Sequence, residues 1–369
     1  MTRGSAGAST GERSMDRPAD EIDYFTDREI LLDPYSYFDD LRAMGRVHQL
    51  KSRNMVAVTG FDEAVEVLLN TDDFSSVSAV VPVQPLPFVP EGDDISRQIE
   101  EHRDEFQRAD ILVSTDGSRH AAFRSLMTVL FTPSRLRAME DYMNGIAAEM
   151  VEQVVAAGRC ELVHDVAVPY VTMVIADLLG VPAEDREIFR SQIDAGPPIV
   201  GALDSREARQ VEPFVFMVPY FMRYIEERRA EPRDDVLTEF ANARYPDGTL
   251  PSPVDVIKNA TFLFGAGQDT SAKLLSNTMR FLAIDPELQA RVRADRKLVG
   301  PLIEEALRLE GSTKSTFRLA RRKTSIGGVE IPAGKSVIVA LAAANRDPAR
   351  WEDPSAFRLN SPRIKENLA

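Results

Sequence analysis

The sequence predicts a mainly α-helical fold with a small antiparallel β component. Apolar residues recur with helical spacing through most of residues 118–309, in stretches much longer than typical strands. In residues 324–340, β-branched residues occur at alternating positions, and a Gly-Gly pair and a Pro-Ala-Gly sequence interrupt this pattern as turns. Such a pattern is typical of short antiparallel strands. Apolar residues make up 44% and charged residues 28% of the 369 residues, the balance of an ordinary globular protein.

The N-terminal region is predicted to contain a tail followed by short elements. Residues 1–20 are rich in Gly, Ser and Thr and lack the apolar core of a signal peptide, so we predict a disordered tail. A proline opens a helical pattern over residues 35–44. The apolar runs 47–50 and 55–58 flank a polar turn and predict a hairpin, after which residues 61–69 return to helical spacing.

A proline-rich loop and a series of helices are predicted next. The loop covers residues 75–90 and is long for a compact enzyme, where such loops are more often functional than incidental. The predicted helices cover residues 118–130, 134–157, 166–179, 212–230, 254–285, 286–295 and 300–309. The strands of residues 324–340 follow, and no internal repeat is visible.

The charge and cysteine content exclude several classes of function. The chain has 58 acidic and 44 basic side chains, and a net charge of −14 argues against nucleic acid or an anionic membrane surface as partner. No apolar run reaches membrane-spanning length, so we expect no membrane insertion. Cys160 is the only cysteine, which excludes an internal disulfide and a multi-cysteine metal site, and we expect a partly buried thiol in a cytoplasmic protein.

The segment Phe264-Gly-Ala-Gly-Gln-Asp-Thr-Ser271 has two interpretations. Its glycines could form a dinucleotide-binding turn after a strand over residues 260–264, although the third glycine of that fingerprint is missing. A continuous helix over residues 254–285 agrees better with the apolar spacing. Glycine costs a helix about 1 kcal/mol relative to alanine, so Ala266-Gly267 predicts either a surface for a flat ligand or a notch for helix packing.

Two polar residues follow these glycines. The Thr270 hydroxyl can donate to the carbonyl of Ala266, four residues back, which bends a helix and opens a groove. Asp269 supplies a titratable group for proton delivery, and a solvated aspartate is the alternative interpretation.

Charged residues at helical spacing occur at two other places. Glu305 and Arg308 share a helical face, and as an exposed pair they would contribute only about 0.3 kcal/mol. His120 and Arg124 lie one turn apart and offer two donors suited to a carboxylate or phosphate. Arg318 is a further cation just before the strand region. Each of these residues alone is also compatible with an ordinary surface position.

The order of these motifs is more specific than any one of them. They are His-x-x-x-Arg from His120, Ala-Gly-x-Asp-Thr from Ala266, Glu-x-x-Arg from Glu305, Phe-Arg from Phe317, Pro-Ala-Gly from Pro332 and Ala-Asn-Arg-Asp-Pro from Ala344. At these separations the set resembles the soluble bacterial class of cytochrome P450, the haem-thiolate monooxygenases. The resemblance runs from about residue 33 to residue 369. It implies one domain over residues 21–369, with the family's triangular helical prism and small sheet.

The resemblance implies a role in cofactor binding for several of these residues. His120, Arg124 and Arg318 match the positions that bind the propionates of haem b, and anionic propionates favour charged donors. Ala266 and Gly267 match the helix surface that lies against the distal face of the haem.

The resemblance also implies the chemistry. Asp269 and Thr270 match the acid–alcohol pair that relays protons to iron-bound O2, and their retention favours O2 with two electrons from a separate ferredoxin-type partner. By the same likeness, the substrate is an apolar small molecule oxidised at a C–H bond, and the protein is a monomer. The candidate substrate-pocket residues are Phe88, Phe214, Phe264 and Thr316.

The charged pair Glu305 and Arg308 matches the family's buried structural pair, in which a broken partner would be costly. Many relatives have an arginine as third member where this sequence has Ala356. Arg358 and Arg363 are both candidates to replace it.

The family's axial cysteine has no match in this sequence. Relatives continue beyond residues 363–369 into a Phe-Gly-x-Gly-x-His-x-Cys-x-Gly loop, whose cysteine binds the haem iron. Cys160 matches no ligand position, so we predict no metal ligand in this chain, an incomplete domain and no activity by itself. A truncated sequence, a disrupted gene and a non-catalytic product all stay open. A non-catalytic helical binder of apolar ligands or haem is the alternative, and a dinucleotide-binding oxidoreductase is a further one.

Overall fold

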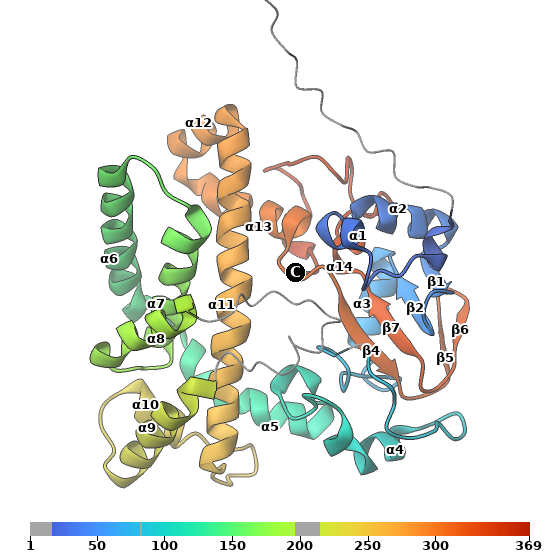
Figure 1. Cartoon of the computed structure of the whole chain (residues 1–369), viewed down its shortest axis with the longest axis horizontal. Coiled ribbons are helices and arrows are strands. Elements are labelled where there is room, and N and C mark those ends of the chain that lie inside the picture. Colours follow the sequence, from blue (N-terminus) through green and yellow to red (C-terminus); the bar gives the residue numbers. More distant parts are fainter. Residues whose placement is uncertain (1–16, 82, 196–214) are drawn as a thin grey trace, which may run out of the picture.

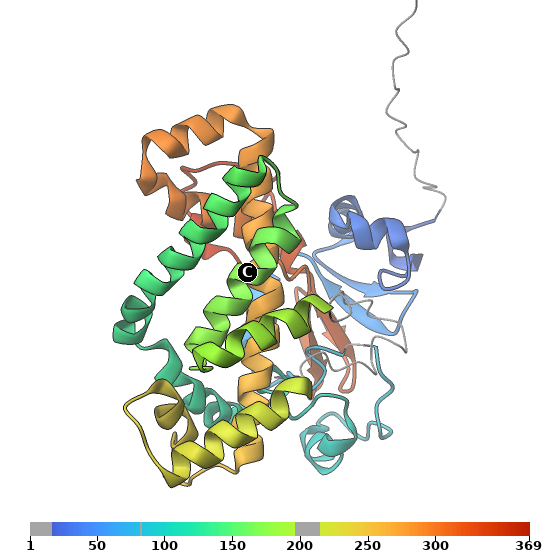
Figure 2. The ribbon, with the colours of Figure 1, turned by 60° about the vertical axis from the view of Figure 1, so that its left-hand side comes forward.

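The computed structural model describes residues 17–81, 83–195 and 215–369. In Figure 1 the helices α6–α10 and the strands lie on opposite sides of the long helix α11, and in Figure 2 helices of this group come forward and cross in front of α11. The helices are α1 (Arg28–Leu32), α2 (Tyr35–Met44), α3 (Phe61–Leu69), α4 (Ser96–Glu101), α5 (Gly117–Met127), α6 (Pro133–Ala157), α7 (Val168–Leu178), α8 (Ala183–Ala195), α9 (Val218–Ala230), α10 (Val236–Ala241), α11 (Pro253–Ile284), α12 (Pro286–Ala294), α13 (Val299–Glu310) and α14 (Leu341–Ala344).

Seven strands form two sheets. They are β1 (Val47–Leu50), β2 (Met55–Val58), β3 (Phe74–Ser75), β4 (Thr316–Ala320), β5 (Thr324–Ile326), β6 (Val329–Ile331) and β7 (Ser336–Val339). The larger sheet has the order β1-β2-β7-β4-β3, and β5 pairs with β6. The predicted hairpin of β1 and β2 is confirmed, with Val47 opposite Val58 in antiparallel register.

The predicted antiparallel β component is confirmed, and one pair of strands departs from it. The strands β2 and β7 run parallel, with Val56 opposite Val337. The alternation of β-branched residues is the same for both strand directions, and a parallel pair requires a long crossover, which here is the whole helical part of the chain. The local pattern therefore predicts the strands but not the direction in which distant strands pair.

The long helices are confirmed, with ends shifted by a few residues. The helix α11 begins after Ser252, whose hydroxyl accepts a hydrogen bond from the backbone N–H of Asp255 at 3.1 Å. The helix predicted over residues 212–230 is α9, and residues 212–214 lie outside the described residues. The prediction missed α8, in which six of the 13 residues are charged and only Ile188, Phe189 and Ile193 are large apolar residues. Among the helices of the described residues, none is both long enough and apolar enough to span a membrane.

The folded chain begins earlier than predicted. Ala19–Glu21 form a 3-10 turn, and the Asp20 side chain is buried beside Lys51 at 3.0 Å and His48 at 3.3 Å. Burial alone would raise the pKa of the Asp20 carboxyl, but hydrogen bonds from Lys51 and His48 lower it below its ordinary value. The predicted tail therefore ends before Ala19, and residues 1–16 lie outside the described residues.

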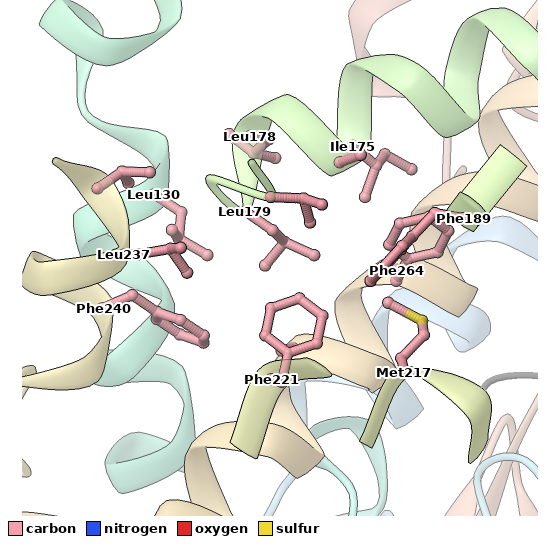
Figure 3. Close-up of a cluster of buried hydrophobic side chains, with 14 of the residues drawn as sticks. Leu130, Ile175, Leu178, Leu179, Phe189, Met217, Phe221, Leu237, Phe240 and Phe264 are labelled. Carbon is pink, nitrogen blue, oxygen red and sulfur yellow. The ribbon is translucent and has the colours of Figure 1, made fainter. Parts of the chain in front are cut away.

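The largest apolar core lies between α7, α8, α9, α10 and α11. Figure 3 shows that Ile175 of α7, Phe221 of α9 and Phe264 of α11 come from different helices of this group and point toward one another. Aromatic contacts continue the packing, with the ring centroids of Phe189 and Phe264 5.9 Å apart. This core holds one face of α11 against the helical part and leaves another face of α11 turned away from it.

Candidate functional site

The middle of α11 is helical throughout, which excludes the dinucleotide-binding alternative. Residues 260–264 form no strand, and the glycines after them continue the same helix. A phosphate site of that kind needs free backbone N–H groups at a helix N-terminus. Gly265 and Gly267 lie far inside a helix that begins at Pro253, where the backbone N–H groups are already used in helical hydrogen bonds.

A hydroxyl and a small side chain mark the open face of α11. The Thr270 hydroxyl donates to the carbonyl of Ala266 at 2.8 Å, as predicted. Ala266 is exposed and Thr270 is half-buried, so both side chains are accessible from the same side of the helix. The carbonyl of Thr270 accepts a second bond, from the Ser312 hydroxyl at 2.6 Å, which ties α11 to the loop before β4.

Gly267 faces a different direction from Ala266. A Cβ atom at Gly267 would lie 2.9 Å from Cδ1 of Ile175 in α7, closer than real Cβ contacts allow. Consecutive residues of an α-helix point about 100° apart, so Ala266 and Gly267 cannot face the same surface. The contact with Ile175 supports the helix-packing interpretation for Gly267, and its role as a cofactor contact stays a prediction. Ala266 keeps that prediction.

The Asp269 carboxylate is bound by a lysine one turn further along α11. The Lys273 ammonium group lies 2.6 Å from Oδ2 of Asp269, and 29% of the Asp269 side chain is exposed. In this arrangement the carboxylate pairs with Lys273 and makes no hydrogen bond with the Thr270 hydroxyl, which donates to the Ala266 carbonyl. The acid–alcohol relay stays a prediction, and it requires Asp269 to leave Lys273.

Three basic side chains near the sheet and on α5 have no carboxylate partner among the described residues. Arg318 on β4 is half-buried and donates only to the Phe317 carbonyl at 2.8 Å and to the Thr316 hydroxyl at 3.4 Å. Burial lowers the pKa of the Arg318 guanidinium, which has no carboxylate within ion-pair distance among the described residues. The side chains of His120 and Arg124 on α5 also have no polar partner within the described part of the chain.

These donors fit a ligand that carries carboxylate groups. A partly desolvated guanidinium without a counter-ion gains from an anion, because charge-assisted hydrogen bonds are about twice as strong as neutral ones. The helix α5, which carries His120 and Arg124, contacts α11, which carries Ala266 and Thr270. The donor set and the open face of α11 therefore belong to neighbouring elements.

The buried pair Glu305 and Arg308 is confirmed. Both residues lie on α13, with 0% and 3% of their surfaces exposed. The guanidinium donates to both carboxylate oxygens, from Nε at 2.9 Å and from Nη2 at 2.7 Å. Its remaining N–H groups donate to the carbonyls of Asn345, Pro354 and Ala356 at 2.7–2.9 Å. Every donor of Arg308 is therefore satisfied inside the protein.

A backbone group takes the place of the third member of this pair. The backbone N–H of Arg358 donates to Oε1 of Glu305 at 2.8 Å. The Arg358 side chain instead binds Asp353 and Glu352 at the surface. Because the role is filled by the main chain, neither candidate side chain, Arg358 nor Arg363, is needed in it.

The predicted substrate-pocket residues are not brought together. Phe264 is completely buried in the core of Figure 3, and its role as a pocket residue stays a prediction. Phe88 packs against Phe106 in a separate cluster, and Thr316 begins β4. Phe214 lies outside the described residues. Aromatic residues at helical spacing serve the core here, and sequence periodicity cannot distinguish a core from a cavity wall.

Cys160 is exposed after the end of α6, which corrects the prediction of a partly buried thiol. Among the described residues, no group of three or more His, Cys, Asp or Glu side chains is arranged to hold a metal ion. Cys160 therefore lies at the surface, and the roles of His120, Arg124 and Arg318 as donors to an anionic ligand stay predictions. Sequence reasoning missed Lys273, although its i, i+4 spacing from Asp269 on a predicted helix indicates the pair.

Comparisons with known proteins agree on one family. The family model described as "Cytochrome P450" matches residues 88–362. "Cytochrome P450 109" of Bacillus spizizenii is 27% identical over 370 residues, which cover 98% of this chain and 83% of that protein. "Cytochrome P450 107B1" of Saccharopolyspora erythraea is 33% identical over 249 residues, covering 67% of this chain and 60% of that protein.

Solved structures show the same similarity. The substrate-free structure of Mycobacterium marinum cytochrome P450 CYP150A6 matches with a TM-score of 0.88 and 44% identity, over 95% of this chain and 82% of that chain. The structure of CYP109E1 from Bacillus megaterium in complex with testosterone matches with a TM-score of 0.73 and 26% identity, over 91% of this chain and 82% of that chain.

Proposed function

The chain belongs to the cytochrome P450 family, and we propose that it supplies the haem- and substrate-binding part of a monooxygenase acting on an apolar small molecule. Proteins of this family are monooxygenases with haem b as cofactor. The proposed reaction inserts one atom of O2 into a C–H bond, with electrons from a separate ferredoxin-type protein. We further propose a cytoplasmic monomer, which the acidic net charge of −14 keeps away from nucleic acid and anionic membranes.

The observation that carries this proposal is Arg318 of β4, whose guanidinium has no carboxylate within ion-pair distance among the described residues. Its guanidinium, together with His120 and Arg124, would hold the two propionate groups of haem. Ala266 leaves room for the flat ring on the open face of α11. When bound, haem supplies the redox centre at which O2 is activated. The Thr270 hydroxyl donates to the Ala266 carbonyl and would accept a hydrogen bond on that face, and Asp269, once released from Lys273, would supply the proton-exchanging carboxyl.

We propose that these 369 residues do not turn over substrate by themselves. The only cysteine, Cys160, is exposed after the end of α6. In the sequence it lies between α5, which carries His120 and Arg124, and β4, which carries Arg318, and it is next to none of them. Haem would therefore be held by its propionates and by apolar contacts, without the thiolate that promotes O–O cleavage. This distinguishes the binding function of the chain from the activity of the family.

The test is a spectrophotometric haem titration of the purified chain. We expect binding of about one haem, without the spectral signature of thiolate ligation in the reduced carbonyl complex. Arg318→Gln removes a charge-assisted hydrogen bond of about 1.5–3 kcal/mol and should raise the dissociation constant about 10- to 100-fold. Arg322→Gln is the matched control, because Arg322 is exposed and already paired with Asp94 at 2.8 Å.

Two outcomes contradict the proposal. Equal affinities for Arg318→Gln and wild type would remove Arg318 from the site. Stabilisation of the chain by apolar compounds, with none by haem, would instead support the non-catalytic binder of apolar ligands.

A further inference from the structure

Asp116 is the centre of a polar cluster at the start of α5. Its carboxylate accepts hydrogen bonds from the Ser75 hydroxyl in β3 and from the backbone N–H of Ser76 at 2.8 Å. It also pairs with Arg321, just after β4, at 2.9 Å and with Arg103 at 3.4 Å. Only 10% of the Asp116 side chain is exposed, so these bonds replace water almost completely.

The charges of this cluster cancel. Arg103 is 3% exposed and also pairs with Glu100 at 2.6 Å, so two guanidinium groups face two carboxylates. Burial alone would lower the pKa of Arg103, but Glu100 and Asp116 raise it. A neutral cluster neither attracts nor repels an anion strongly. The Asp116 charge also raises the pKa of Arg318, against the lowering by burial, so its influence on a neighbouring ligand combines this charge effect with the geometry of the bonds.

The geometry connects the two sides of the proposed haem cradle. The backbone carbonyl of Asp116 accepts from the N–H of His120 at 3.1 Å, in the first turn of α5. Its carboxylate holds Arg321, which lies three residues after Arg318 on the same chain segment. The Ser75 hydroxyl of β3 ties the same carboxylate to the sheet, and within the described residues no side chain of α5 itself makes a hydrogen bond or ion pair with a strand.

We propose that Asp116 is a positioning residue that fixes the distance between the donors of α5, His120 and Arg124, and the donor of β4, Arg318. The cradle then matches a ligand with two carboxylates a fixed distance apart. This inference rests on the proposed function and deepens it. Asp116 does not touch the ligand, because its carboxylate oxygens are occupied by Ser75, Ser76 and the two arginines.

The experiment measures the geometry first, without haem. In a Cys160→Ser background, spin labels at Ala121 of α5 and at Gln49 of β1, both exposed, report the separation of α5 from the sheet that contains β4. We expect a narrow distance distribution in the parent chain and a broader one in Asp116→Ala. The matched control is Asp94→Asn, because Asp94 also accepts a backbone N–H, from Ser96 at 2.9 Å, and pairs with an arginine, but is exposed and does not contact α5.

The same variants are then titrated with haem. Asp116→Ala should raise the dissociation constant about 10- to 100-fold, the usual effect of removing a group that orients a ligand-binding residue, and Asp94→Asn should leave it unchanged. If Asp116→Ala does not fold, Arg321→Gln breaks the same link from the other side and should broaden the distribution in the same way.

The outcomes separate this inference from the proposed function. An unchanged label distribution in folded Asp116→Ala overturns the positioning role. So does wild-type haem affinity in that variant, even where the proposed function stands. If the parent chain binds no haem but Asp116→Ala still broadens the distribution, the positioning role stands and the proposed ligand is wrong.

Discussion

Two glycines with helical neighbours have different reasons to be glycine. Gly267 of α11 packs against Ile175, and a Cβ atom there would approach Cδ1 of that side chain to 2.9 Å. Gly145 of α6 is exposed, and an added Cβ would meet nothing within 4 Å. At the first position glycine allows the helices to approach each other, and at the second it only weakens the helix.

Alanine substitutions should therefore have opposite effects at these positions. Gly145→Ala should raise the free energy of unfolding by about 0.5–1 kcal/mol through helix propensity. Gly267→Ala should lower it by about 1 kcal/mol, because overpacking of about 1–3 kcal/mol exceeds that gain. Urea unfolding of both variants gives the comparison.

A double mutant identifies the cause at Gly267. Ile175→Val removes the Cδ1 atom, so Gly267→Ala should become neutral or stabilising in that background. The same loss in both backgrounds would show that the contact with Ile175 is not the reason.

At the scale of elements, the pair Glu305 and Arg308 connects α13 to a segment without regular structure. Arg308 donates to three carbonyls between residues 345 and 356, and Glu305 accepts from the backbone of Arg358. These three carbonyls lie outside the regular helices and strands, and α13 supplies their hydrogen-bond donors. The pair therefore organises the chain after α14 as well as its own helix.

Glu305→Gln should lower the free energy of unfolding by about 3–5 kcal/mol, because it leaves the Arg308 cation buried without its counter-charge. Glu101→Gln is the control, since Glu101 pairs with Arg97 at 2.6 Å on the surface and should cost no more than about 1 kcal/mol. Equal losses in urea unfolding would contradict a special role of burial.

At the scale of the whole molecule, a cluster joins α2 near the N-terminus to α13 and the region beyond it. The Tyr35 hydroxyl donates to Oε2 of Glu310 at 2.6 Å, and Lys314 and Arg346 pair with Glu310 at 2.8 Å and 3.3 Å. Burial alone would raise the pKa of Glu310, but hydrogen bonds from Lys314 and Tyr35 lower it below 4.5. Burial and Glu310 raise the pKa of Tyr35 above its ordinary value of 10.0.

These shifts predict a window of pH in which the cluster contributes fully. The lowered pKa of Glu310 gives a contribution complete above about pH 4.5 and lost as the pH falls through the native value. The raised pKa of Tyr35 gives one complete below about pH 10 and lost at higher pH. Unfolding measured from pH 3 to about 11 should therefore show a smaller acid loss in Glu310→Gln and a smaller alkaline loss in Tyr35→Phe. If the two variants lose as much unfolding free energy as the wild type at acid and at alkaline pH, the cluster is not the cause of these losses.

The sequence predicts the parts of this molecule that depend on neighbours along the chain. Apolar spacing predicts α11, and the i, i+3 spacing of Glu305 and Arg308 places them on one face. Spacing does not show that Phe264 enters a core or that Gly267 meets α7, because both contacts come from another helix. The partners of Asp116 are equally distant, since Ser75 and Arg321 precede and follow it by 41 and 205 residues. Motif order identifies the family, which the comparisons confirm.

The parallel pair of β2 and β7 has a consequence for synthesis on the ribosome. Val58 pairs with Val339, roughly 280 residues later. One edge of β2, the second strand of the hairpin, therefore has no partner until that distant segment is made. At about 5–20 residues per second, translation of this stretch takes on the order of 15–60 seconds. During that interval the apolar edge of β2 is a template for other nascent strands, which is a site where a chaperone would bind.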